Sequence, residues 1–152
     1  QTPGNETPSY NDIVGNNYQE KIVNYAQTFG GRNESALSGY CQAWVADVYF
    51  DVLGGTRQSA ASAKDAGNAW AVSDDMNNIP LGACVYAIYN PYGHVAIYIG
   101  NGQVASNDGT SYGIPRIETL SNFTDWASRK PGYVKMCWGW NGGNNYDLRN
   151  MN

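Results

Sequence analysis

The chain has 152 residues and a formal net charge of −4, a length that suits one domain with a core of its own. Hydrophobic residues make up 42% of it and charged residues 14%, the composition of a globular protein rather than of a disordered segment. Basic residues form no run, which argues against a nucleic-acid partner, and no apolar run reaches the roughly 18–20 residues of a membrane span.

The first residues are polar and contain Thr, Pro, Gly and Asn, so we expect a flexible arm over 1–12 and one domain over 13–152. The chain starts at Gln1 rather than Met, which is typical of a mature product from which a signal peptide has been removed. Scarce charge beside abundant Asn and Gly also suits an extracellular or wall-associated protein. We therefore expect secretion.

The N-terminal half predicts three helices. Asn17, with Glu20 three positions later, predicts the start of the first helix, whose apolar residues recur at helical spacing until Gly30-Gly31. A second helix is predicted to begin near Ser38 and to end before a second glycine pair. The alanine-rich stretch 59–72 predicts a third, with a face of small side chains.

After Pro80 the pattern changes to short runs of β-branched and aromatic residues, separated by Gly, Asn and Pro. Four runs predict strands: 83–89, 94–99, 103–106 and 133–140. The pair Asn101-Gly102 between two of these runs predicts a tight hairpin. One more short helix is predicted over 121–129. Helices followed by an antiparallel sheet indicate an α+β domain.

Cys41 is a candidate nucleophile. If Ser38 caps the second helix, Cys41 lies in the first turn, where free backbone N–H groups and the helix dipole stabilise negative charge. That position lowers the pKa of a thiol and favours the reactive thiolate. The alternative interpretation is a small hydrophobic residue on the buried face of an amphipathic helix.

His94 is the single histidine of the chain, and it opens the predicted strand 94–99 directly after Tyr92-Gly93. A histidine at this point projects from the rim of a sheet, where it can serve a site, although it can also be an ordinary surface residue. A cysteine at a helix start followed by a histidine on a strand is the layout of papain-like amide hydrolases. The two residues together therefore predict thiol catalysis.

At this point the chain resembles the NlpC-type and CHAP-type peptidoglycan cysteine peptidases and amidases, over residues 18–140. The likeness rests on four segments. Phe29-Gly30-Gly31 precedes the cysteine at the NlpC-type spacing, and Cys41-Gln42-Ala43-Trp44-Val45 is similar to the CHAP-type helix. Ile79-Pro80-Leu81-Gly82-Ala83 resembles the turn that opens the family's central strand, and residues 93–102 (GHVAIYIGNG) match its histidine strand and hairpin.

The resemblance implies a papain-like fold with N-terminal helices packed on a small antiparallel sheet. It also implies a secreted hydrolase that cuts an amide bond of peptidoglycan through a thioester on Cys41. His94 would transfer the protons. The sequence departs from the NlpC pattern beside the cysteine, where Tyr40 and Gln42 stand, and at the upstream tyrosine, whose place falls near Gln27.

A third polar residue that orients His94 is expected on the strand after the hairpin. Counting along the family's pattern reaches Ser106, whose hydroxyl is short for this task. Asn107 is the first choice, because its amide oxygen can accept the imidazole N–H. Ser106 is second and Asp108 third, and the alternative interpretation is that the three residues only form a turn.

For substrate binding, the expected residues are Gln27, Tyr40, Trp44 and Tyr92. Trp138 and Trp140 are further aromatic candidates for a groove that holds a glycopeptide. The alternative interpretation is that Trp44, Trp138 and Trp140 belong to the hydrophobic core. We expect bacterial peptidoglycan as the partner and a monomeric enzyme.

Two other classes of function stay open at the level of sequence: a non-catalytic wall-binding or glycan-binding module of the same fold, and a papain-like protein deamidase or acyltransferase. No cofactor is expected, and the three scattered cysteines with one histidine lack the spacing of a metal site. Cys84 and Cys137 lie in two predicted strands, where they form either a disulfide or two buried thiols.

Overall fold

The computed structural model describes residues 13–107 and 112–151. The predicted arm 1–12 and Asp108 lie outside the described residues. Within these ranges the fold is α+β, as predicted. The helices are α1 (Tyr18–Ala26), α2 (Cys41–Leu53), α3 (Ala63–Trp70) and α4 (Leu120–Ser128), with the short 3₁₀ helices η2 (Asn33–Ala36), η3 (Asn144–Tyr146) and η4 (Leu148–Asn150).

The strands form one six-stranded sheet in the order β1-β6-β2-β3-β4-β5, and every neighbouring pair is antiparallel. Their bounds are β1 (Ala71–Ser73), β2 (Cys84–Ile88), β3 (His94–Gly100), β4 (Gln103–Ser106), β5 (Arg116–Thr119) and β6 (Lys135–Gly139). The β3–β4 hairpin turns at Asn101 and Gly102, whose φ angles of 53° and 70° are those of a type I′ turn. The four predicted strands and the hairpin are therefore confirmed.

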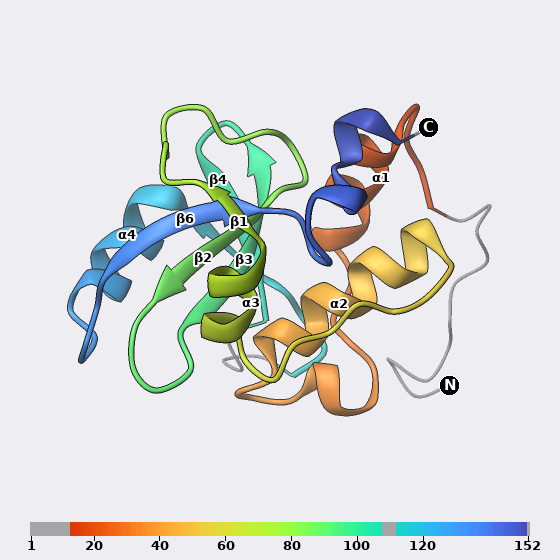
Figure 1. Ribbon diagram of the computed structural model, residues 1–152. Helices are drawn as coiled ribbons and strands as arrows, with labels where there is room; N and C mark the ends of the chain where they lie inside the picture. The colour runs from red at the N-terminus through yellow and green to blue at the C-terminus, as the bar shows by residue number, and fades with distance from the viewer. Residues whose placement is uncertain (1–12, 108–111, 152) are drawn as a thin grey trace.

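Helices cover both faces of the sheet (Figure 1). On one face α1, α2 and α3 pack against Tyr86, Val95 and Ile97, and on the other α4 packs against residues that alternate with these, such as Val85 and Ala96. Both faces of the central strands are buried, which explains why β2 reads as a continuous apolar run. The sheet thus separates two clusters of buried side chains.

The start of α2 differs from the prediction. Tyr40, not Ser38, is the N-cap residue, and Cys41 is the first residue of the helix. The reason lies in the preceding turn: Gly39 has a φ of 84°, and the Tyr40 backbone N–H donates to the Leu37 carbonyl at 3.4 Å. Ser38 lies within this turn and not on the helix. The correction moves Cys41 even closer to the free N–H groups of the helix end.

The three cysteines are buried free thiols, so a Cys84–Cys137 disulfide was the wrong alternative. Cys84 lies opposite Gly139 in the β2–β6 pair, and Cys137 lies opposite Tyr86. The two thiols therefore occupy diagonal positions, which hold Cβ atoms about 7 Å apart. A disulfide needs Cβ atoms at about 4 Å.

None of the helices in the described ranges is both long enough and apolar enough to cross a membrane.

Candidate active site

Cys41 lies where the first turn of α2 meets the start of β3. Its side chain is 8% exposed, and its sulfur is hydrogen bonded to the His94 side chain and to the backbone N–H groups of Val95 and Gln42. Burial raises the pKa of the thiol, but the charge of His94 and these hydrogen bonds lower it by more. The net result is a pKa below the ordinary value, as in an activated nucleophile.

The His94 ring is fixed by the aromatic residues of α4. Its centroid lies 5.6 Å from that of Phe123 and 5.7 Å from that of Trp126, both in edge-to-face geometry. The preceding Gly93 has a φ of 66°, and a Cβ at that position would lie 2.6 Å from the Ala87 carbonyl oxygen. Helix α4 thus packs two aromatic rings against His94, and Gly93 allows β3 to start where it does.

A cavity of about 690 Å³ opens beside Cys41 and His94. Tyr40 and Tyr92, both predicted to bind substrate, line it and are 41% and 69% exposed. Most of the other lining residues come from the start of α2, the segment before α3 and the turn before β3, and three come from η2, from directly after β4 and from α4. They are Glu34, Gly39, Gln42, Ala43, Arg57, Ser59, Ala60, Ala61, Ser62, Ala63, Tyr89, Pro91, Gly93, Asn107 and Trp126.

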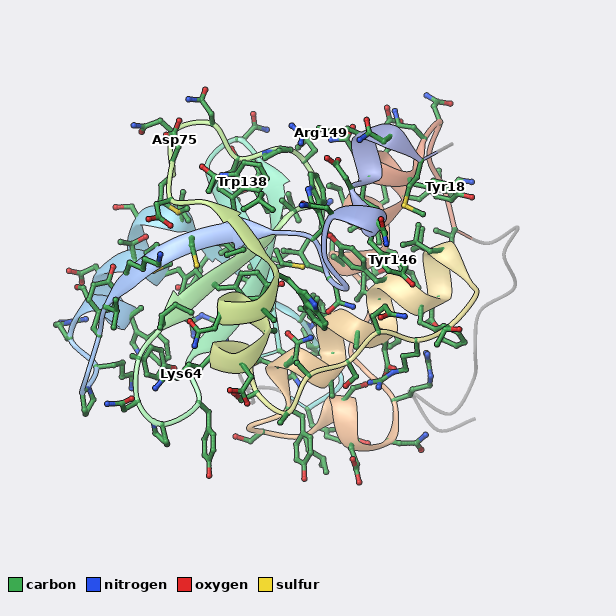
Figure 2. The ribbon with its side chains drawn as sticks, viewed as in Figure 1. Tyr18, Lys64, Asp75, Trp138, Tyr146 and Arg149 are labelled. Atoms are coloured by element: carbon green, nitrogen blue, oxygen red, sulfur yellow. The ribbon has the colours of Figure 1, made fainter. Side chains whose placement is uncertain are left out.

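Trp44 does not line this cavity, and its predicted contact with substrate is wrong. The side chain is fully buried, and its indole N–H donates to the Phe29 carbonyl at 2.8 Å. Trp138 and Trp140 are also core residues, 7% and 0% exposed. Figure 2 shows Trp138 near Arg149 and well apart from Lys64, whose backbone N–H donates to the carbonyl of the cavity residue Tyr92.

Gln27 is also absent from the residues that line the cavity within the described ranges. It is the exposed C-cap residue of α1, and its amide nitrogen donates to the Val23 carbonyl of the same helix at 3.2 Å. The expectation that Gln27 binds substrate is therefore corrected by its position. Tyr25 of the same helix instead donates its hydroxyl hydrogen to Asp51 at 2.6 Å, away from Cys41.

Two aromatic residues of the cavity were missed by sequence reasoning. Trp126 is 39% exposed and touches the His94 ring, and Tyr89 is 9% exposed. Burial, with a smaller contribution from the charge of Cys41, raises the pKa of Tyr89 to about 12. Trp126 falls in the predicted helix 121–129, and neither residue belongs to a motif that marks it.

The candidates for the third polar residue occupy different environments. Asn107 is 5% exposed, and its amide nitrogen donates to the carbonyls of Ser35 at 2.5 Å and Leu37 at 3.0 Å. Ser106 is 1% exposed, and strand alternation places it on the face of Val104, the face that α4 covers. Asp108 lies outside the described residues. Which of the three orients His94 stays a prediction.

A second cavity of about 470 Å³ lies beyond His94 and Trp126, which line both cavities. It is lined by Arg116 and Glu118 of β5, by Asn122 and Asp125 of α4, and by Arg129 directly after that helix. They form two ion pairs, Arg116–Glu118 at 3.4 Å and Arg129–Asp125 at 3.3 Å. His94 and Trp126 thus separate a mostly uncharged cavity from one that offers both signs of charge.

No group of three His, Cys, Asp or Glu residues that could hold a metal ion occurs among the residues described.

Comparisons with known proteins agree with this fold. No protein-family model matches the sequence, and no curated protein matches it significantly. Among solved structures, NlpC2 from Trichomonas vaginalis superposes with a TM-score of 0.57 at 19% identity, over 85% of this chain and 49% of that one. The peptidoglycan hydrolase RipB from Mycobacterium tuberculosis gives 0.47 at 18% identity, over 86% of this chain and 70% of RipB.

The likeness to NlpC2 confirms the predicted fold: the chain has the α+β architecture of that protein and spans about half of its length. The fold by itself does not assign the reaction, which has to be argued from the site.

Proposed function

We propose that the chain is a cysteine peptidase or amidase that hydrolyses an amide bond of bacterial peptidoglycan. The observation that carries the proposal is the pairing of Cys41 with His94 beside a cavity of about 690 Å³. A buried thiol with a lowered pKa in contact with an imidazole is the arrangement of a nucleophile and its acid–base partner. The fold shared with an NlpC protein supports the same conclusion.

In the proposed reaction the Cys41 thiolate attacks the carbonyl carbon of the scissile amide. The C–N bond then breaks, and the protonated His94 gives its proton to the leaving amine. The acyl group remains on Cys41 as a thioester. Neutral His94 next removes a proton from a water molecule, which attacks the thioester, and the carboxylic acid leaves as the thiol is restored. This chemistry needs no cofactor.

The first turn of α2 supplies the stabilisation for the tetrahedral intermediates. Cys41 and Gln42 are the first two residues of the helix, and N–H groups at such positions have no carbonyl partner inside the helix. The Gln42 N–H already bonds to the sulfur. An oxyanion formed at the carbon attacked by this sulfur lies within reach of these N–H groups. Preorganised donors of this kind are worth roughly 3–4 kcal/mol each.

The two cavities accommodate the two halves of the substrate. We assign the leaving half to the second cavity, because His94, which protonates the leaving amine, lines that cavity and Cys41 does not. Its paired Arg and acidic side chains suit a peptide residue that carries both a carboxylate and an amine. The acyl half occupies the larger cavity, with Tyr40 and Tyr92 at its rim. Peptidoglycan peptides offer charges of both signs and so fit this division.

The proposed enzyme acts outside the cell, where its substrate lies, and as a monomer. The test is incubation with purified cell walls, followed by turbidity and by mass spectrometry of the released fragments. Fragments with a new amine and a new carboxyl group are expected from the wild type and not from Cys41→Ser. Binding to the walls without release of fragments would identify a non-catalytic wall-binding module instead.

A further inference from the structure

The Asn107 side chain connects the end of β4 to the segment that precedes the nucleophile. Its amide nitrogen donates to two backbone carbonyls, that of Ser35 at 2.5 Å and that of Leu37 at 3.0 Å. Asn107 is 5% exposed; its bond to Ser35 is buried and its bond to Leu37 is partly buried. One side chain thereby uses both amide hydrogens on a segment some 70 residues earlier in the chain.

The contact continues to the first turn of α2. The Leu37 carbonyl also accepts the Tyr40 backbone N–H at 3.4 Å, and the Tyr40 carbonyl accepts the Trp44 N–H at 3.0 Å. Tyr40 is the N-cap residue and directly precedes Cys41. Asn107 is therefore linked to the beginning of α2 through the backbone of the turn formed by residues 37–40.

Helix α2 needs such support because its own N-terminus lacks a cap. Tyr40 makes no side-chain capping bond, and the preceding Gly39 adopts a φ of 84° in a position where a Cβ would meet no neighbour. The usual capping side chains, Ser, Thr, Asp and Asn, fix a helix start by bonding its free N–H groups. Here the preceding segment has to fix it.

The same segment is held at its other end. Arg32, which precedes η2, forms a bidentate ion pair with the buried carboxylate of Asp51 on α2. The glycine pair before it also has a structural reason: a Cβ on Gly30 would lie 1.8 Å from the Gly113 carbonyl oxygen. The connection after β4 therefore contacts the chain before α2 at two places: Asn107 bonds to Ser35 and Leu37, and Gly113 packs against Gly30.

We propose that Asn107 is a positioning residue for Cys41, acting through its amide nitrogen on the segment from Ser35 to Tyr40. The segment fixes the start of α2, and the start of α2 holds the Cys41 sulfur against His94. This role differs from orienting His94, which uses the amide oxygen of Asn107 as an acceptor. The catalytic consequence rests on the proposed function, but the effect on the thiol does not.

Two substitutions separate these roles. Asn107→Asp keeps an acceptor oxygen and loses both N–H donors, and its carboxylate faces two carbonyl oxygens. Asn107→Ala removes donor and acceptor together. Asn24→Asp is the matched control, because the Asn24 amide also donates to a backbone carbonyl, that of Val14 at 3.0 Å, far from the cavity.

The readouts are the rate at which iodoacetamide alkylates Cys41 and amide hydrogen exchange across residues 35–41. For both Asn107 variants we expect alkylation at least about tenfold slower and faster exchange in this segment, since both hydrogen bonds of the Asn107 amide nitrogen are lost. Asn24→Asp should match the wild type in both. Continued protection of Cys84 and Cys137 from alkylation shows that the sheet is intact.

The proposal would be overturned if Asn107→Asp showed the same alkylation rate and the same amide exchange as the wild type. If only Asn107→Ala slowed the alkylation of Cys41, Asn107 would instead act through its oxygen, as the residue that orients His94. If Asn107→Asp does not fold, Asn107→Ser replaces it, because its short hydroxyl cannot reach both carbonyls, and the same faster exchange is expected. Neither readout requires turnover. A wild type that reacts as expected here but leaves cell walls intact would therefore contradict the proposed function and not the role of Asn107.

Discussion

Cys41 and Cys84 are both buried thiols, but their surroundings shift their pKa values in opposite directions. Burial raises the pKa of Cys84 to about 11, although the neighbouring Tyr49 and Tyr86 and a backbone hydrogen bond oppose this rise. Burial also raises the pKa of Cys41, but His94 and two backbone N–H groups bring it below its ordinary value. The difference is the neighbouring imidazole, because desolvation is common to both. The charged partner of Cys41, and not its exposure, therefore sets it apart as the proposed nucleophile.

The largest expected effect comes from replacing Cys41 and Cys84 with serine, one at a time. Cys41→Ser should lower the turnover of cell-wall peptide on the order of 10⁴-fold or more, since the acyl intermediate can no longer form at a thiolate. Cys84→Ser should leave turnover within a few-fold of the wild type. The release of new amines from purified walls measures both. Equal losses in the two variants would mean that the effect is one of folding.

Removal of the imidazole should make Cys41 resemble Cys84. In His94→Ala, burial acts on Cys41 without the opposing charge, so we expect its pKa to rise above the ordinary value. Alkylation by iodoacetamide near pH 7 should slow on the order of tenfold or more, because a smaller fraction of Cys41 is present as thiolate. The double variant with Cys41→Ser should hydrolyse walls no more slowly than Cys41→Ser alone. Unchanged alkylation in His94→Ala would remove His94 from the site.

A smaller effect is expected from the aromatic support of His94. Trp126→Ala removes one of the two rings that fix the imidazole, and about a tenfold loss of kcat follows from a misplaced acid–base group. Tyr133→Ala, at a half-buried position outside both cavities, is a suitable control. Alkylation of Cys41 across a range of pH, measured beside kcat, shows whether the thiol has changed as well. A wild-type kcat for Trp126→Ala would show that Phe123 alone suffices.

The smallest effect concerns stability, and it belongs to Cys84. The folded protein binds the Cys84 proton more tightly than the unfolded chain does, so the protonated thiol adds to the free energy of unfolding. This addition is complete below the unfolded pKa of about 9 and is lost as the pH rises to about 11. The slope is about 1.4 kcal/mol per pH unit for one thiol. Urea unfolding should therefore show a smaller alkaline loss of stability in Cys84→Ala than in the wild type. Parallel curves would contradict the raised pKa.

Much of the fold could be predicted because the local patterns agree with the tertiary structure. Asn17 accepts a hydrogen bond from the Glu20 backbone N–H as a capping residue, and Asn101-Gly102 forms the predicted hairpin turn. The edge strands β1 and β5 were missed. Their sequences, AVS and RIET, are short, and the residues of β5 are mostly exposed, so neighbouring strands hold them rather than a buried face.

The candidate site was predictable only in part. Cys41 and His94 were found because each stands at the start of a regular element, a position that the sequence patterns mark. Trp44 was misplaced, because an aromatic residue three positions after Cys41 shares its side of the helix and can face either the cavity or the core. Asn107 was found as a polar candidate, but its bonds to Ser35 and Leu37 join segments that no local pattern connects.

The most direct test of the account is the pH dependence of alkylation, followed separately for the three cysteines by mass spectrometry of the native protein. The alkylation rate of Cys41 should reach half of its maximum below pH 9, and it should do so at lower pH than that of Cys84 or Cys137, whose pKa values are both about 11. The profile of Cys41 should move to higher pH in His94→Ala. If the three thiols instead titrate together near pH 11, with no response of Cys41 to the loss of His94, then Cys41 is a buried structural thiol and the proposed mechanism is wrong.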